Sequence, residues 1–160
     1  GVLTTGGRTE QFTMKERPAL PPACFVQMGD FLRYALDEAV AQGLRQVVIG
    51  GMVGKLTKMA QGETITHANR AGVDTQLLAD LAASLGAPPA DCAAIAAAET
   101  ARFAAERMEA LGLSAPFHTA LARAVVRTLM APARYGGQFQ LHVLVCDFDG
   151  RKVAEAFSHD

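Results

Sequence analysis

The sequence has few cysteines, no tryptophan and no strong charge of either sign. Its three cysteines, Cys24, Cys92 and Cys146, lack CxxC spacing, so we expect no disulfide framework, no zinc site and no protein-bound metal. A formal net charge of −1 excludes a global attraction to nucleic acid or to an acidic membrane. No apolar run approaches the roughly 20 residues that span a bilayer, and no signal-peptide pattern opens the chain. These absences predict a soluble, cytoplasmic protein.

The length and composition fit one globular domain. The chain has 160 residues, of which 50% are hydrophobic, enough for one good core but not for two large ones. We therefore expect a single α/β domain over residues 1–160. The apolar run that starts at Val2 has no initiator methionine and no lead-in before it, which leads us to expect a piece of a longer protein.

Three turns in the first third of the chain share one form. Each has a short apolar run, then glycine, then the expected start of a helix; they lie within residues 2–10, 25–31 and 47–55. If the runs are strands of one parallel sheet, all three turns lie at its carboxyl edge, where open α/β sheets bind ligands. The sequence thus predicts the place of a site before it identifies the ligand.

The order of the expected elements predicts the fold class. Strands are expected over residues 2–5, 24–26, 46–49 and 139–146, and helices over 9–17, 31–41, 73–85, 91–111 and from Ser114 to Pro132. This order predicts a three-layer α/β domain with a mainly parallel sheet, helices on both faces and an Ala-rich helical segment before the last strand. The expected apolar stripe of the second helix is Phe31, Tyr34, Leu36, Ala39 and Val40, and that of the last helix is Leu121, Val125 and Leu129.

The glycine-rich turn after the third expected strand is the clearest candidate for an anion-binding site. A P-loop needs glycine at Ile49 and Ser or Thr at Leu56, and a dinucleotide fingerprint also needs glycine at Ile49, so both motifs fail. Glycine still lets a backbone approach a ligand closely, and a helix N-terminus favours an anion. Lys55 and Lys58, expected on the first turn, add positive charge. The alternative is a tight turn that only packs on the sheet.

The other turns offer further polar groups. Arg8 suits a carboxylate, Thr9 a helix cap and Glu10 an ammonium or hydroxyl group. The alternative is only a capped helix with Arg8 in solvent. Asp30 could bind an amine or a ribose, or only cap its helix. His67 could be an acid, a base or a ligand contact, or only a surface residue. Of the remaining residues that could do chemistry, His118 and His159 look exposed, His142 alternates within a strand, and Cys24 and Cys146 are expected in the core.

Several segments together resemble one known family. These are residues 5–10, 27–31 and 51–62, then Thr66-His67 and Asp74. In order and spacing they are similar to the cobalt-precorrin-5B C1-methyltransferase (CbiD) family of cobalamin biosynthesis. The resemblance covers roughly the whole chain and is most specific from Thr5 to Asp74. In that family these segments belong to the C-terminal part of a longer protein, so the missing N-terminal portion is an expected partner that covers part of the macrocycle.

The resemblance implies a reaction and a set of ligands. S-adenosylmethionine would donate a methyl group to ring carbon C1 of cobalt-precorrin-5B, a tetrapyrrole, giving cobalt-precorrin-6A. The implied donor-binding residues are Gly6, Gly7, Gly29, Asp30, Gly50, Gly51, Met52 and Gly54. The alternative for Gly6, Gly7 and the turn from Gly50 to Gly54 is a substrate carboxylate. The implied substrate-binding residues, which meet the acetate and propionate carboxylates, are Thr5, Arg8, Thr9, Glu10, Lys55 and Lys58. His67 is the implied catalytic residue, as a proton acceptor, or else a contact to a substrate carboxylate.

Other hypotheses remain open beside the resemblance. The chain could be a non-catalytic module that binds an anionic ligand or pairs with a partner subunit through the helices of residues 91–130. The sequence does not decide whether the chain forms a homo-oligomer. A nucleotide-dependent phosphotransferase is disfavoured by the failed P-loop spacing.

Overall fold

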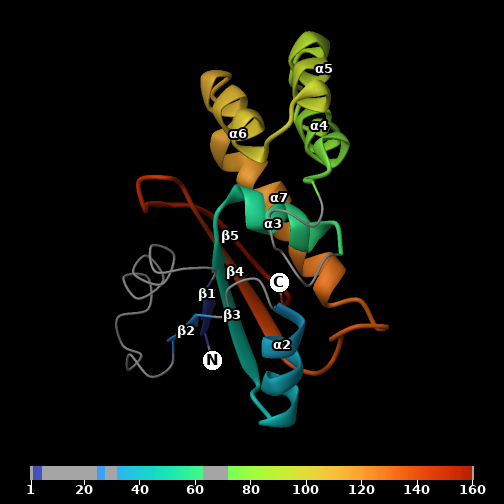
Figure 1. Cartoon of the computed structure of the whole chain (residues 1–160), viewed down its shortest axis with the longest axis vertical. Coiled ribbons are helices and arrows are strands. Elements are labelled where there is room, and N and C mark those ends of the chain that lie inside the picture. Colours follow the sequence, from blue (N-terminus) through green and yellow to red (C-terminus); the bar gives the residue numbers. More distant parts are fainter. Residues whose placement is uncertain (1, 5–24, 28–31, 63–71, 160) are drawn as a thin grey trace.

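The computed structural model describes residues 2–4, 25–27, 32–62 and 72–159. The strands are β1 (Val2–Thr4), β2 (Phe25–Gln27), β3 (Gln46–Gly51), β4 (Gln140–Cys146) and β5 (Lys152–Phe157). The helices are α2 (Leu32–Ala41), α3 (Val53–Ala60), α4 (Thr75–Ser84), α5 (Pro89–Ala97), α6 (Ala101–Ala110) and α7 (Ser114–Leu129). Figure 1 shows the sheet with α4, α5 and α6 extending beyond one end of it. The α/β class is confirmed.

The strands form one sheet in the order β2-β1-β3-β4-β5. β1 pairs in parallel with both β2 and β3, and β3 pairs in parallel with β4. β5 returns antiparallel to β4 and forms an edge. Because the first four strands point the same way, their carboxyl ends share one edge of the sheet.

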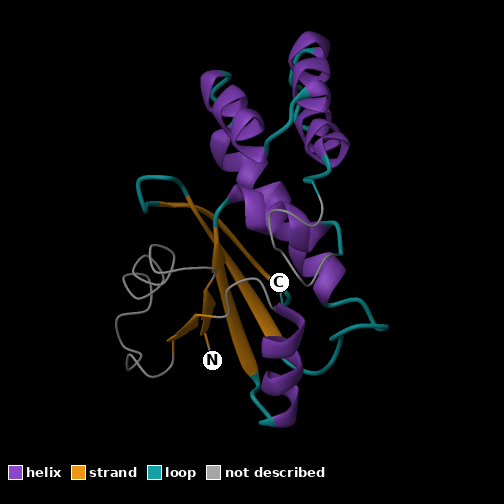
Figure 2. Ribbon diagram, viewed as in Figure 1, coloured by secondary structure: helices purple, strands orange, loops and turns teal. Residues whose placement is uncertain are grey.

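The described helices next to the sheet lie on one of its faces. The chain crosses from β2 to β3 and from β3 to β4 in the same direction, and right-handed crossovers in one direction lie on one face. Figure 2 shows α2, α3 and α7 on this common face. The helix expected over residues 9–17 lies outside the described residues, so a layer on the opposite face stays a prediction.

The core lies between the sheet and these helices. Val47 and Ile49 of β3 and Val143 of β4 belong to it and are at most 1% exposed. The opposite face of the same strands is buried as well, as expected for strands with continuous apolar runs. Three residues expected in the buried stripe of the last helix, Leu121, Val125 and Leu129, are fully buried in α7.

Among the described residues, no helix is long and apolar enough to cross a membrane.

The single helix expected over residues 91–111 is wrong, because the chain breaks between α5 and α6. Ala98 is extended, with φ −74° and ψ 162°. The Thr100 hydroxyl then accepts a hydrogen bond from the Phe103 N–H at 3.2 Å and caps α6. A side-chain cap satisfies an amide that a new helix would otherwise leave without a partner. Because the surrounding sequence is rich in alanine, which favours a helix throughout, the Thr100 cap was not recognised in the sequence.

Three further expectations from the sequence are corrected. β4 does not close the sheet, because the turn at residues 147–150 leads into β5. Tyr34 is not part of the buried stripe of α2; it is 56% exposed, while Leu32 and Leu36 are fully buried. Ser114 is the first residue of α7 rather than its cap, and Leu113 takes the N-cap position.

His118, expected at the surface, is buried in α7 with 5% of its area exposed. Its Nδ1 lies 2.8 Å from the Ser114 carbonyl oxygen, which accepts, so Nδ1 carries the hydrogen of the neutral ring. Burial lowers the pKa of His118 below 6.5, although the Ser114 carbonyl and the charges of Asp147 and Glu109 act in the opposite direction. The folded protein therefore favours neutral His118.

This burial predicts that acid destabilises the fold. As the pH falls below 6.5, the unfolded chain takes up a proton that folded His118 resists, so the free energy of unfolding decreases. Urea unfolding between pH 7.5 and 5 measures the slope. His118→Gln should make the slope shallower, whereas the same change at exposed His159 should not. An unchanged slope in His118→Gln would contradict this account.

Candidate functional site at the carboxyl edge of the sheet

The carboxyl ends of the first three strands lie side by side. Thr4 of β1 is in register with Gln27 of β2 on one side and with Gly50 of β3 on the other. The chain moves from β1 to β2 in one direction and then to β3 on the other side of β1. The strand order therefore reverses between β1 and β3, and open α/β sheets bind ligands at such a switch point. The predicted convergence of these strand ends is confirmed.

Gly51, at the end of β3, and Gly54, at the start of α3, have different environments. A Cβ on Gly51 would lie 3.0 Å from Cδ2 of Leu56, which is fully buried. Gly51 thus allows α3 to pack closely against the end of β3. A Cβ on Gly54 would meet nothing within 4 Å. Gly54 is not required for packing among the described residues, and its backbone faces open space.

The two lysines of α3 occupy different turns. Lys55 is in the first turn, as expected, and is partly exposed. Lys58 is in the last turn, which corrects the expectation, and is only 6% exposed. Between them, the Thr57 hydroxyl donates to the Val53 carbonyl oxygen at 2.6 Å, inside the core. Met52, at the N-cap position, has no side-chain hydrogen bond to the helix.

A cavity of about 470 Å³ lies next to this helix start. Its lining comes from four segments: the start of α3, the approach to α4, the start of α6 and the turn after β4. The lining residues are Met52, Val53, Gly54, Lys55, Lys58, Gly72, Val73, Glu99, Thr100, Ala101, Arg102 and Phe148. The volume falls within the roughly 300–1,000 Å³ of small-molecule sites. The cavity is therefore large enough for a ligand of cofactor size.

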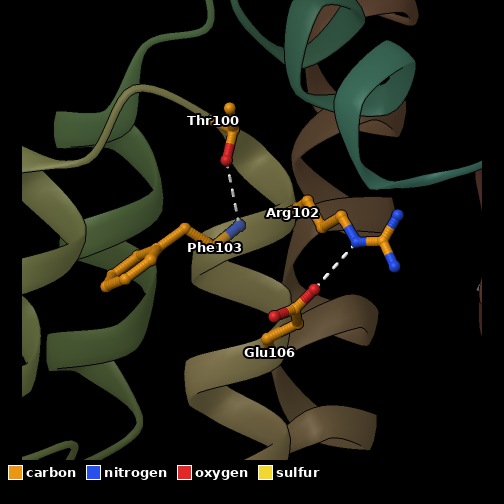
Figure 3. Close-up of polar contacts among 4 residues, drawn as sticks. All are labelled: Thr100, Arg102, Phe103 and Glu106. Carbon is orange, nitrogen blue, oxygen red and sulfur yellow. Dashed lines mark hydrogen bonds and ion pairs between the residues drawn. The ribbon is translucent and has the colours of Figure 1, made fainter.

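The wall formed by α6 is held by local contacts (Figure 3). Thr100 caps the helix, and Arg102 Nε donates to Glu106 Oε1 at 2.8 Å one turn later. The Arg102 guanidinium carbon also lies 4.2 Å from the centre of the Phe148 ring. This cation–π contact joins α6 to the turn after β4. Arg102 thus connects two walls of the cavity.

Positively charged side chains outnumber negatively charged ones in the cavity lining. Lys55, Lys58 and Arg102 carry positive charge, and Glu99 is the single lining carboxylate among the described residues. The starts of α3 and α6 also face the cavity, and helix N-termini add partial positive charge. Apolar side chains, including Val53, Val73 and Phe148, lie between these groups. Such a lining suits a ligand that has a flat apolar body and carboxylate groups.

The connection between α3 and α4 is fixed by hydrogen bonds. The Gln61 side-chain oxygen accepts from the Asp74 N–H at 2.7 Å, and Asp74 in turn caps α4 by accepting from the Leu77 N–H at 3.1 Å. The Thr128 hydroxyl donates to the Ala60 carbonyl oxygen at 2.9 Å and ties the end of α3 to α7. Gln61 and Asp74 of the resemblance therefore have structural roles here. They position the two segments that face the cavity.

The structure brings together part of the predicted site. Met52, Gly54, Lys55 and Lys58 line the cavity, whereas Gly50 and Gly51 lie in β3 and are not among its lining residues. The predicted residues outside the described part of the chain are Thr5, Gly6, Gly7, Arg8, Thr9, Glu10, Gly29, Asp30 and His67.

Some lining residues were not found from the sequence. These are Gly72, Val73, Glu99, Thr100, Ala101, Arg102 and Phe148. The expected continuous helix over residues 91–111 concealed the start of α6, for which Thr100 was the only local signal in the sequence.

In the described part of the chain, no three His, Cys, Asp or Glu side chains form a potential metal site.

Comparison with known proteins identifies the family. A family model described as CbiD, C-terminal domain, matches residues 65–157. The chain belongs to the CbiD family. The match includes α4–α7, β4 and β5. Among solved structures, none matches this chain.

Curated CbiD relatives extend the similarity to nearly the whole chain. A cobalt-precorrin-5B C(1)-methyltransferase from Paracidovorax citrulli (strain AAC00-1) is 82% identical over 98% of this chain and 42% of its own length. Relatives with the same name are 64% identical in Methylococcus capsulatus and 43% identical in Salinispora tropica, over 99% and 96% of this chain and 41% and 40% of their own lengths. The chain thus spans about two-fifths of the length of these relatives.

The two glycines should respond oppositely to alanine. Gly51→Ala places a Cβ against buried Leu56 and should destabilise the fold by about 1–3 kcal/mol. Gly54→Ala meets open space within a helix and should be neutral or stabilising by up to about 1 kcal/mol. Urea unfolding of both variants checks this contrast. Equal destabilisation would show that Gly54 also has a packing role.

Proposed function

We propose that the chain takes part in S-adenosylmethionine-dependent methylation of C1 of cobalt-precorrin-5B in cobalamin biosynthesis. A relative that is 82% identical to this chain carries the name of this activity. The observation that carries the proposal is the cavity at the carboxyl end of β3, where Gly54 and two lysines face an apolar wall. The start of α3 beside it lies within residues 5–74, over which the methyltransferase resemblance is most specific.

The cavity fits the methyl donor. Its volume of about 470 Å³ suits a nucleoside with an amino-acid side arm. Val53, Val73 and Phe148 offer apolar surface to a purine, and the first amides of α3 can donate to a carboxylate. When bound, S-adenosylmethionine supplies a methyl group to the nucleophilic ring carbon, while its sulfur keeps the bonding electron pair.

The substrate carries many carboxylates, and the lysines can bind them. Lys55 and Lys58 lie on one side of the cavity, where an ammonium group pairs with a carboxylate as a point charge. The macrocycle is larger than the donor, so we place it at the mouth of the cavity with its acetate and propionate groups toward α3. Thr5, Arg8, Thr9 and Glu10 are proposed to bind the same rim.

The chain contributes to the reaction mainly by positioning. Methyl transfer from a sulfonium requires an in-line approach, and holding two reactants in such a geometry can supply about 7–11 kcal/mol. The core packing of α3 and the contacts between Arg102 and Phe148 fix the cavity walls for this purpose. His67 is proposed to accept a proton from another atom of the macrocycle, or to contact one of its carboxylates.

Several finer features are part of the same proposal. We propose helices on both faces of the mainly parallel sheet, which gives three layers. Gly6, Gly7, Gly29 and Asp30 would then approach the donor from the turns after β1 and β2. The part of the relatives that this chain does not span is proposed to cover the macrocycle.

Binding of the reaction product tests this function. Calorimetric titration of the chain with S-adenosylhomocysteine should show saturable binding. Gly54→Ala should lower the affinity about tenfold, because its added methyl group occupies open space beside the cavity. The unfolding experiment on the same variant is the control, since it should remain fully folded. Lack of binding by the parent chain would contradict the proposed donor site.

A further inference from the structure

The α6 side of the cavity contains a carboxylate that the proposed function leaves without a role. Glu99 precedes the Thr100 cap, is exposed and lines the cavity. It has no hydrogen-bond or ion-pair partner among the described residues. Arg102, the nearest lining cation along the chain, pairs with Glu106 at 2.8 Å instead. Glu99 is therefore available to a ligand.

We infer that Glu99 binds the two ribose hydroxyl groups of the methyl donor. This inference rests on the proposed function and deepens it. A carboxylate has two acceptor oxygens and suits a pair of neighbouring O–H donors. Hydrogen bonds to an ionised acceptor are also shorter and stronger than those between neutral groups.

The distribution of charge determines which part of the donor meets Glu99. The amino-acid end of the donor carries a carboxylate, which is attracted to the first amides of α3. The ammonium group is attached to the same carbon atom and stays at that end. Glu99 comes from a different wall, at the start of α6. The ribose, between the side arm and the purine, has two hydroxyl donors on neighbouring carbon atoms, whereas both donor hydrogens of the adenine amino group are on one nitrogen atom.

The surfaces around Glu99 suit the purine beyond the ribose. Phe148 and Val73 line the same cavity, and the guanidinium of Arg102 lies over the Phe148 ring at 4.2 Å. This contact favours one position of the ring. A purine can bury its flat surface against the apolar surface of Phe148 and Val73.

A structural role for Glu99 makes a different prediction. An acidic residue at a helix N-terminus stabilises the helix, so Glu99 could act on α6 alone. In that case its replacement would lower the free energy of unfolding and leave ligand affinity unchanged. Binding and unfolding measurements on one variant separate the two roles.

The test uses Glu99→Gln and two ligands. Calorimetry of the chain should show about tenfold weaker binding of both S-adenosylhomocysteine and 5′-methylthioadenosine, which has the ribose but lacks the amino-acid arm. Glu109→Gln, which removes an exposed carboxylate of α6 outside the cavity lining, is the matched control and should leave both affinities unchanged.

The other outcomes overturn the inference in distinct ways. A loss confined to S-adenosylhomocysteine would assign Glu99 to the ammonium group. Unchanged affinity for both ligands, with lower stability, would make Glu99 a helix-stabilising residue only. If the parent chain binds neither ligand, the donor site of the proposed function fails, and the role of Glu99 fails with it.

Discussion

The contact between Gly51 and Leu56 is the constraint on which the site depends. Gly51 ends β3 without a side chain, and fully buried Leu56 occupies the space that a Cβ would need. This close approach brings the start of α3 directly over the carboxyl end of the sheet. Gly54 and Lys55 consequently face the cavity, whereas a Cβ at position 51 would require the buried Leu56 side chain to shift.

The opposite wall depends on a break in the alanine-rich segment. The chain becomes extended at Ala98 after α5, and Thr100 then caps α6, so the starts of two helices, α3 and α6, line the cavity. Arg102 then joins this helix to Phe148 after β4. The site is therefore assembled from segments far apart in sequence, and the core residues of α3 and α7 hold them together.

Local signals in the sequence account for what could be predicted. The apolar run Val47–Ile49 followed by glycines indicated β3 and its turn, and the parallel register then placed the strand ends together. Alanine fits a continuous helix and a broken one equally well, so periodicity could not locate the break before α6. The burial of His118 depends on tertiary packing, to which its polar side chain gives no clue. Phe148 was seen only as part of a turn, because its partner Arg102 lies 46 residues earlier in the chain.

The central claim is that the cavity between α3 and α6 holds the methyl donor. A crystal structure of the chain with S-adenosylhomocysteine tests it most directly. The account predicts the ligand between Gly54 and Phe148, with its carboxylate at the start of α3. A ligand bound elsewhere, such as in the groove between Arg123 of α7 and Phe157 of β5, would contradict it.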